Sequence, residues 1–528
     1  MGLLWLCRRL VRITVDIAVI LLIIVLLPGI PPDASFTSTE HDECLPLEGP
    51  LAKNNKLDAA DRIMDGKIVG PESIASRDPE EIFVSLHGGK ILRIWGPKFD
   101  HFKIVASIGP GCDGPWQEKV CGRPLGLRFA PDGRLLVADS YLGLFVVDVD
   151  TGEKEQLFDI SQEIDGAVPK ILDDIDVDAE GNIYWSDAST VCTLEDGLVE
   201  FLSDPSGRLL RFDPKTKSNT VLVKNVHFAN GVQLSPDHEF ILFCETFKNR
   251  VIRYWLKGPK AGQTEVFVDR LPGMPDNIRS NKNGGYYVSL IGVYSEFSRK
   301  INGIIGKLPL LRKLAVRLLT MTRLVFDSFT RIYPNQYTER IAYWILNLHP
   351  ISQAQTHFSN LTIVVELDAQ GNIINSLQGN SGKVLQISET DRVGNYLFFG
   401  SPYNKYLGSL YVGPSVIEVE GKGVKIKTGK EPALQREEQV NKKEIIKEEK
   451  DLSSDENVQE IVQEDRGEES AYKKIGKAEK QSEEIKEHMK LKQKVEHVAD
   501  IKINDIVEKE AAAVESKEKL ENTEKEEL

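Results

Sequence analysis

The sequence is poor in cysteine, with six in 528 residues, and no two of them form a C-x-x-C pair. Cysteine pairs at that spacing are the usual mark of zinc sites, so this class of metal centre is not expected. The chain also lacks a basic stretch interleaved with aromatic residues, and its formal net charge is -14. Both properties are opposite to those of nucleic-acid binding proteins, and no nucleic-acid partner is expected.

Aromatic and apolar residues become scarce after about residue 421, where Lys and Glu crowd together. Such a composition cannot bury a core, so 421–528 is predicted to be a largely disordered tail with transient helix. Too few apolar residues recur there for a coiled coil. The chain ends in Lys525-Glu526-Glu527-Leu528, similar to the KDEL retrieval signal, which leaves the endoplasmic reticulum membrane and the plasma membrane both open.

The N-terminus carries a membrane signal. Three arginines, Arg8, Arg9 and Arg12, precede an apolar run over 13–30 in which Asp16 is the sole charge. This pattern predicts a signal-anchor transmembrane helix at 13–30, a cytoplasmic segment at 1–12 and a type II topology with the rest in the lumen or outside. No A-x-A-like cleavage site follows, although a cleaved signal peptide remains the alternative. Residues 31–65 are then a linker.

Cysteine placement fits an oxidising compartment. Cys112 and Cys121 bracket a loop containing Gly and Pro, and a disulfide between them is expected. Cys192 and Cys244 lie in apolar strand contexts and are predicted to be buried as free thiols. Asn360-Leu361-Thr362 is a glycosylation sequon, which suits a lumenal or extracellular domain.

The region before the tail is a weak repeat of strand pairs separated by turns. The first strand of each pair ends in a small or acidic residue, and the pairs recur roughly every 45 to 60 residues, as four-stranded propeller blades do. Six such units begin at Ile82, Leu135, Asn182, Phe240, Gly285 and Asn395. The fifth interval is longer because 296–357 has apolar residues at helical spacing. The prediction is an all-β, six-bladed β-propeller over 66–420 with a helical insertion at 296–357; a pair of β-sandwiches is the alternative.

Carboxylates and carboxamides stand at the edges of four of these units. They belong to the segments Gly70–Ser73, Asp173-Asp174, Phe228–Gly231 and Pro275–Asn277. Oxygen donors gathered from distant parts of a chain are what a hard cation such as calcium needs. If the repeats close into a ring, these segments meet at its centre. Each residue taken alone is equally typical of an ordinary turn.

Several linked motifs resemble those of the strictosidine synthase-like family. They are Cys121–Gly126, Asn230–Pro236, Pro275–Arg279 and Gly284–Tyr287, which follow one another in the family's order. The resemblance extends from about Gly70 to Val412 and includes the N-terminal anchor. It implies a six-bladed propeller. Paraoxonases, gluconolactonases and diisopropyl fluorophosphatase are more distant relatives, and all hold calcium in a central tunnel.

Carried over to this chain, the resemblance implies a calcium set of Glu72, Asp173, Asn230, Asp276 and Asn277. Relatives usually have Asn at the position of Asp173, and the extra carboxylate here raises the negative charge of the site. Gluconolactonase-type relatives imply that Asp276 is the base or nucleophile.

The histidine pair of paraoxonases has no counterpart in this sequence. The matching positions are Leu125 and about Ser140, and the nine histidines offer no evident substitute. His227 stands three residues before Asn230 and is a candidate for the tunnel mouth, although a structural role is commoner. Strictosidine synthesis is not carried over, because its catalytic Glu has no counterpart that can be placed here.

The resemblance implies a calcium-dependent arylesterase or lactonase acting on small apolar esters. The membrane would be a partner through the N-terminal helix and through the basic helical insertion, which serves equally well as a lid over the pocket. The rival hypothesis is a non-catalytic receptor, adhesion or scaffold propeller with a structural calcium ion. No feature of the sequence identifies a protein partner.

Overall fold

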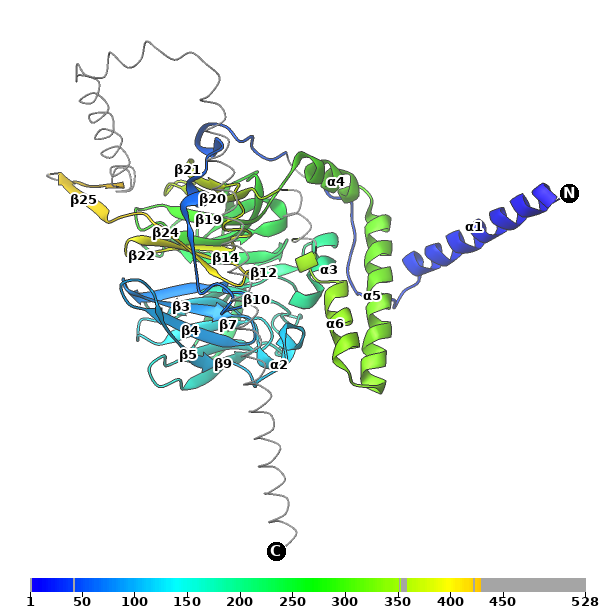
Figure 1. The fold of residues 1–528 in the computed structure, drawn as a ribbon, viewed down its shortest axis with the longest axis horizontal. Coiled ribbons are helices and arrows are strands. Elements are labelled where there is room, and N and C mark those ends of the chain that lie inside the picture. The colour runs from blue at the N-terminus through cyan, green and yellow to red at the C-terminus, as the bar shows by residue number, and fades with distance from the viewer. Residues whose placement is uncertain (1, 41–42, 351, 353–358, 421–422, 429–528) are drawn as a thin grey trace, which may run out of the picture. The chain divides into compact units, whose positions relative to one another are not determined.

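The computed structural model describes residues 2–40, 43–350, 352, 359–420 and 423–428, and strands dominate it (Figure 1). Six antiparallel sheets of four strands each follow one another along the described chain. Their strands are β2 to β5 (Ile74–Asp78, Glu81–Leu86, Lys90–Trp95, His101–Ser107), β6 to β9 (Pro124–Phe129, Leu135–Asp139, Gly143–Val147, Lys154–Asp159), β10 to β13 (Leu172–Val177, Ile183–Asp187, Gly207–Asp213, Ser218–Val226), β14 to β17 (Ala229–Leu234, Phe240–Glu245, Arg250–Trp255, Thr264–Val268), β18 to β21 (Gly273–Ser280, Tyr286–Val293, Thr362–Leu367, Ile373–Gly379), and β22 to β24 with β1 (Glu389–Val393, Tyr396–Gly400, Leu407–Tyr411, Asp61–Ile63).

The six sheets form a closed ring. The first strand of each sheet contacts the first strand of the next, and β22 returns to contact β2. β1 pairs antiparallel with β24, with Asp61 opposite Ser409, so the last sheet joins both ends of the ring. These contacts confirm the predicted six-bladed β-propeller. β1 lies upstream of residue 66, inside the segment that the sequence assigns to a linker.

The apolar core lies between neighbouring blades. Six clusters of buried residues each join two adjacent sheets around the ring. Trp185 and Phe212 of the third blade, for example, pack with Leu136 of the second. Because the middle strands of each blade contact a sheet on both sides, both of their faces are apolar. The innermost strands are thereby free to present polar side chains at the centre of the ring.

Three helices form an insertion between β19 and β20, as predicted for 296–357. They are α4 (Glu296–Gly306), α5 (Pro309–Ile332) and α6 (Gln336–Ile345). Val316 of α5 and Leu346 after α6 pack against Val199 of α3 (Gly197–Leu202), which holds the insertion on the propeller. The N-terminal helix α1 (Gly2–Leu26) reaches the same insertion, because Arg317 of α5 donates hydrogen bonds to the Ile24, Val25 and Leu27 carbonyls at 2.7–3.0 Å.

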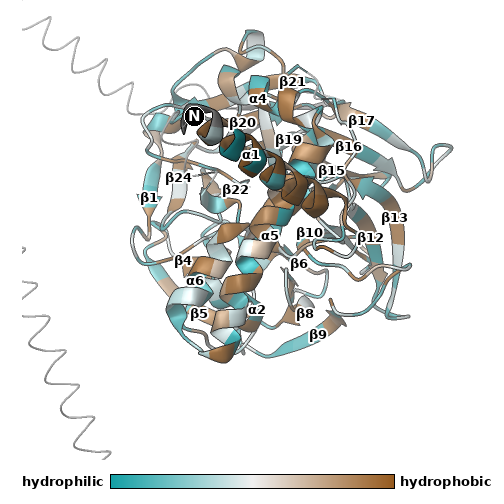
Figure 2. Ribbon diagram, turned by 90° about the vertical axis from the view of Figure 1, so that its right-hand side faces the viewer, coloured by the Kyte–Doolittle hydropathy of each residue, from teal (hydrophilic) through white to brown (hydrophobic). Residues whose placement is uncertain are grey.

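Figure 2 shows apolar residues along α1 and α5. Among the helices of the described residues, none combines the length and the apolar character needed to cross a bilayer. Residues 429–528, which are most of the predicted tail and include the KDEL-like end at 525–528, lie outside the described residues. The remaining elements are α2 (Glu118–Cys121), the 3-10 helices at Gly49–Leu51, Lys56–Ala59, Pro115–Gln117, Leu194–Asp196 and Thr246–Lys248, and the hairpin β25 (Ser415–Glu420) and β26 (Gly423–Thr428).

The cysteine predictions hold where the structure tests them. Cys112 and Cys121 form a disulfide, and Cys192 and Cys244 are buried as free thiols. Asn360 is exposed just before β20, so its sequon is accessible, and its glycosylation stays a prediction.

Candidate metal centre and cavity

Three of the predicted ligands lie at irregularities in innermost strands. The pairing registers of β10, β14 and β18 with their neighbours shift between Leu172 and Ile175, between Ala229 and Val232, and between Pro275 and Ile278. A bulge adds an unpaired residue and re-aims the side chains around it. The three ligands inside these bulges are Asp173, Asn230 and Asp276.

Glycine allows these strands to approach one another. A Cβ on Gly231, which follows Asn230, would lie 2.6 Å from the backbone oxygen of Asp276. A Cβ on Gly400 would lie 1.9 Å from the backbone oxygen of Glu72. No other residue fits at these distances, so the glycines set how closely the ligand-bearing segments gather.

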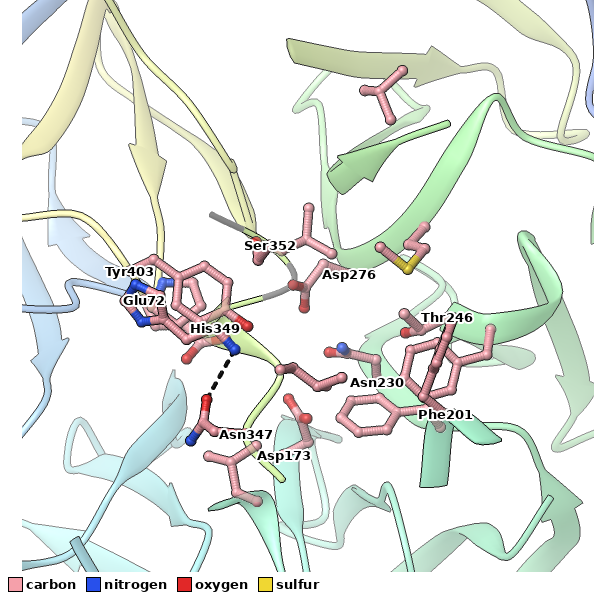
Figure 3. A pocket seen from close by; sticks show the side chains of 18 of the residues that line it. Glu72, Asp173, Phe201, Asn230, Thr246, Asp276, Asn347, His349, Ser352 and Tyr403 are labelled. Carbon is pink, nitrogen blue, oxygen red and sulfur yellow. Dashed lines mark hydrogen bonds between the residues drawn. The ribbon is translucent and has the colours of Figure 1, made fainter. Parts of the chain in front are cut away.

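Four of the five predicted ligands line one cavity of about 690 Å³. Asp173, Asn230 and Asp276 point toward a common space, and Glu72 joins them from the segment before β2 (Figure 3). All four are at most 5% exposed. Three of their oxygens have no hydrogen-bond partner among the described residues: Glu72 Oε2, Asn230 Oδ1 and Asp276 Oδ1. Unpaired buried oxygens are costly, and a cation would satisfy them.

The pKa values of the acidic groups in the site also favour a bound cation. Burial, together with the neighbouring carboxylates, raises the pKa of Glu72 to about 8 and the pKa of Asp173 and Asp276 well above their ordinary values. Arg123 lies 3.9 Å from Glu72 and offsets this effect in part. Arg279 acts on Glu72 in the same direction, but its guanidinium is already paired with Asp174 and Glu389, so the acidic groups of the site are only partly neutralised.

The donor set fits a hard cation. Carboxylate and carboxamide oxygens are the ligands that calcium prefers, and they come here from four different blades. Within the described residues, no three His, Cys, Asp or Glu side chains are gathered tightly enough to form a metal centre by themselves. The fifth predicted ligand, Asn277, does not line the cavity; its buried side-chain amide has no hydrogen-bond partner among the residues described.

A second polar layer lies directly behind the first. Arg279 donates to both oxygens of Asp174, at 2.6 and 2.9 Å, and also to Glu389. Asp174 accepts from the Val232 amide at 2.7 Å, and Glu389 accepts from the Ile74 amide at 2.9 Å. Ser73 completes the set, since its hydroxyl donates to Glu389 and accepts from the Leu127 amide.

This Asp174–Arg279–Glu389 network ties together the innermost strands of all six blades. Burial acts to raise the pKa of Asp174, but the adjacent Arg279 guanidinium overcomes it and holds that pKa below its ordinary value. Of the predicted Asp173-Asp174 pair, one residue therefore faces the cavity and the other holds the ring closed.

The cavity has two unlike walls. One wall is apolar, and its residues include Leu125, Phe201, Phe228, Phe247, Met274 and Ile291. The other is polar, and its residues include His87, Glu118, Arg123, Tyr343, His349 and Tyr403. Phe297 and Ile301 of α4 line the cavity as well, so the insertion covers it. An apolar cavity with a few convergent polar groups is typical of a small-molecule site.

Sequence reasoning missed the histidines of this cavity. Leu125 lines it at a position where a paraoxonase has histidine, but His87 and His349 line it too. His87 follows β3 and His349 follows α6, and these positions become neighbours only when the ring closes. His227 does not line the cavity; it is buried, with Nε2 3.0 Å from the Glu200 carbonyl and its ring against Phe247.

Comparisons with known proteins agree with the family resemblance. The chain matches the family model described as strictosidine synthase over residues 173–259 and the model described as strictosidine synthase-like, N-terminal, over 49–94. The Drosophila melanogaster protein named adipocyte plasma membrane-associated protein Hemomucin is 35% identical over 450 residues, which are 82% of this chain and 76% of that protein. The Homo sapiens adipocyte plasma membrane-associated protein is 30% identical over 365 residues, 68% of this chain and 80% of its own.

The solved structures that resemble this chain share less of its sequence than these relatives do. A gluconolactonase from Xanthomonas campestris is 13% identical, with a TM-score of 0.41 over 73% of this chain and 99% of its own. The propeller assignment accordingly rests on the six sheets and their ring of contacts.

Proposed function

The chain belongs to the strictosidine synthase-like family of adipocyte plasma membrane-associated proteins, and we propose that it is a calcium-dependent hydrolase of small apolar esters or lactones. The observation that carries the proposal is the cluster of unpaired buried oxygens on Glu72, Asn230 and Asp276 beside an apolar wall. Charge that is left uncompensated inside a protein is costly, and sites of this kind are typically kept for function.

Glu72, Asp173, Asn230 and Asp276 would hold the ion. Bound calcium would supply Lewis-acid polarisation of a carbonyl oxygen. The apolar wall, including Phe228 and Phe247, would bind the acyl or aryl part of the substrate. Asp276 would act as base or nucleophile, since its Oδ1 has no hydrogen-bond partner among the described residues.

The insertion would control access to this chemistry. Phe297 and Ile301 of α4, with Tyr343 of α6, lie over the cavity. Arg323 of α5 pairs with Glu195 and Asp196, which holds the insertion against the propeller. A covered site excludes bulk water and strengthens every electrostatic interaction inside it.

The test is ester and lactone hydrolysis by the full-length protein in detergent, using phenyl acetate and a γ-lactone. Calcium-supported turnover is expected to disappear on chelation and in Asp276→Asn. Asp368→Asn is the matched control, because Asp368 accepts hydrogen bonds in a turn far from the cavity and should leave turnover unchanged. No turnover in the wild-type protein, with chelation lowering only the melting temperature, would refute the hydrolase and favour the non-catalytic propeller.

We further propose that the N-terminal helix and the insertion associate with a membrane. Large apolar side chains at least half exposed stand on the insertion: Ile304, Leu310, Leu311, Val325, Phe329 and Ile332. Basic residues, including Lys307, Lys313 and Arg331, lie among them. Exposed apolar surface next to basic residues is typical of helices that lie in a lipid interface, and the relatives are named plasma membrane-associated proteins.

Flotation with anionic lipid vesicles tests the insertion as a membrane contact. In protein lacking residues 2–30, Phe329→Ser with Ile332→Ser should reduce flotation several-fold. The matched control is Phe102→Ser with Ile104→Ser, which also removes an exposed Phe and an exposed Ile but from strand β5, and it should not reduce flotation. Equal flotation of the insertion variant and the β5 variant would refute the membrane contact of the insertion.

Glycosylation tests the topology. A glycan at Asn360 of the full-length protein, detected as a loss of mass after glycosidase treatment, would place the propeller in the lumen or outside, as the type II topology requires.

A further inference from the structure

A buried histidine–carboxylate pair stands in the polar wall of the same cavity. His87 Nε2 lies 3.0 Å from Glu118 Oε2, and the two side chains are 10% and 2% exposed. We propose that His87 is the proton-transfer residue of the hydrolysis and that Glu118 is its positioning residue. This inference rests on the proposed function, and it assigns the base role to His87 and leaves Asp276 to the ion.

The partners of Nε2 determine the tautomer of His87. Nε2 lies near two groups that only accept hydrogen bonds, Glu118 Oε2 and the Pro115 carbonyl at 3.3 Å. Burial acts to raise the pKa of Glu118, but its hydrogen bond with His87 and its other polar neighbours keep that pKa below its ordinary value, so the carboxylate is ionised. The ring proton therefore belongs on Nε2, which leaves the lone pair on Nδ1. Among the described residues, Nδ1 has no hydrogen-bond partner.

Glu118 is held from several sides. The Tyr141 hydroxyl donates to Oε1 at 2.5 Å and accepts from the Glu195 amide at 3.1 Å. The Tyr343 hydroxyl of α6 lies 3.5 Å from Oε2. The carboxylate therefore has little freedom to turn away from His87, and orientation of this kind is what a positioning residue supplies.

The disulfide loop and a glycine bring the pair together. Glu118 begins α2, inside the loop that Cys112 and Cys121 close. This loop packs on the turn after His87, where a Cβ on Gly89 would lie 1.7 Å from the Cys121 carbonyl oxygen. Gly89 also has a φ of 74°, which a residue with a side chain rarely adopts. The Gly88-Gly89 sequence thus has a structural reason, namely the close approach of the loop that carries Glu118.

The charges facing His87 leave it a neutral base at neutral pH. Burial and the Arg123 guanidinium lower its pKa, and Glu118 opposes them. Burial, and then the charge of His87 when it is protonated, lower the pKa of His349, the other histidine of the wall, to about 4, so His349 is neutral as well. A neutral imidazole whose lone pair is on Nδ1 can accept a proton without first losing one.

The proposed step balances with water as the co-reactant. Nδ1 takes a proton from a water molecule while the water oxygen forms a bond to the acyl carbon. The imidazolium then gives this proton to the leaving oxygen as the carbon–oxygen bond of the ester breaks. The products are a carboxylic acid and an alcohol, and His87 returns to its starting state.

Three variants of the full-length protein test the assignment with calcium present. His87→Gln retains a donor for Glu118 but has no base, so kcat should fall about a hundredfold or more while KM and calcium affinity by calorimetry stay within about twofold. Glu118→Gln should lower kcat less and move the acidic limb of the kcat/KM profile to lower pH, because the carboxylate raises the pKa of His87. His101→Gln is the matched control: His101 pairs with Asp100 at 2.9 Å but on the exposed surface.

The outcomes separate this inference from the proposed function. If the wild-type protein hydrolyses the substrate and the kcat of His87→Gln equals that of His101→Gln, the base is another residue. This inference then fails, and the proposed function stands. If His87→Gln loses calcium affinity as well, His87 is structural and the inference also fails. Absence of turnover in the wild type defeats the proposed function and the inference with it. Partial rescue of His87→Gln by added imidazole would confirm the proton-transfer role.

Discussion

Asp173 and Asp174 are consecutive residues with almost the same burial and opposite environments. They are 3% and 0% exposed. Asp173 faces the cavity among other carboxylates, and its pKa lies well above the ordinary value because of burial and of Glu72. Asp174 faces Arg279 with both oxygens paired, and its pKa lies below the ordinary value. The difference separates a layer organised for a ligand from a layer organised for stability.

The contrast arises from one backbone feature. Both residues lie where the register of β10 shifts, between Leu172 and Ile175, so that Asp173 lines the cavity while Asp174 accepts from Arg279. Stability then comes from the closed Asp174–Arg279–Glu389 network. The open layer, formed by Glu72, Asp173 and Asp276, carries the cost of burying three neighbouring carboxyl groups, which is expected where function requires it.

Breaking the closed layer, which is the Asp174–Arg279–Glu389 network, should have the largest effect on stability. Arg279→Met leaves Asp174 and Glu389 buried without a cation, and loss of one partner of a buried pair costs about 3–5 kcal/mol. The free energy of unfolding should fall by this amount whether or not calcium is present. Chemical denaturation measures it, and Arg134→Met, which removes an exposed pair with Asp132, should change it by less than about 1 kcal/mol. Equal effects of the two variants would contradict the role of the network.

Calcium removal should act on the open layer alone. A ligand present at a hundredfold excess over its Kd stabilises the folded state by about 2.7 kcal/mol. Chelation should therefore lower the melting temperature of the wild-type protein but not that of Asp276→Asn. Arg279→Met, although less stable, should keep its response to chelation. A response that survives in Asp276→Asn would place the ion elsewhere.

Much of this arrangement is accessible from the sequence. The blades are predictable because each is a local run of paired strands, and the donors are predictable because their residue types and order match a known family. The bulges are not, since they depend on the register between strands. The His87–Glu118 pair joins residues that meet only through a disulfide loop and a glycine turn, and β1 closes the ring from a segment without a strong strand pattern.

Asp173→Asn should sharpen the comparison by removing one charge from the open layer. Asn has nearly the same size and shape as Asp, so the fold should tolerate the change. With one carboxylate fewer, calcium affinity should fall about tenfold, which is about 1.4 kcal/mol. The metal-free protein should become more stable, because Asp173 is among the carboxylates that repel one another. Calorimetric titration and melting after chelation check the two effects, and unchanged calcium affinity would exclude Asp173 from the ligand set.

Glu200 offers a case intermediate between Asp173 and Asp174. It is buried like Asp174, but its partners are the hydroxyls of Ser189 and Ser206 and the Ser206 backbone amide in place of a guanidinium. Burial raises the pKa of Glu200 to about 7, from 4.5 for an unperturbed glutamate. A carboxyl group with a raised pKa binds more protons in the folded state than in the unfolded state at intermediate pH. The stability that it contributes is therefore complete below about pH 4.5 and is lost as the pH rises through about 7.

Glu200→Gln should remove this pH dependence. The free energy of unfolding of the wild-type protein should decrease between pH 4.5 and pH 8 by about 3 kcal/mol more than that of the variant. Denaturation across this range measures the difference, and Glu153→Gln, at an exposed turn, should follow the wild-type curve. Parallel curves for wild type and Glu200→Gln would mean that hydroxyl and amide donors stabilise a buried carboxylate as well as Arg279 stabilises Asp174. The contrast between the two central layers would then depend on repulsion among Glu72, Asp173 and Asp276, and not on the absence of a guanidinium.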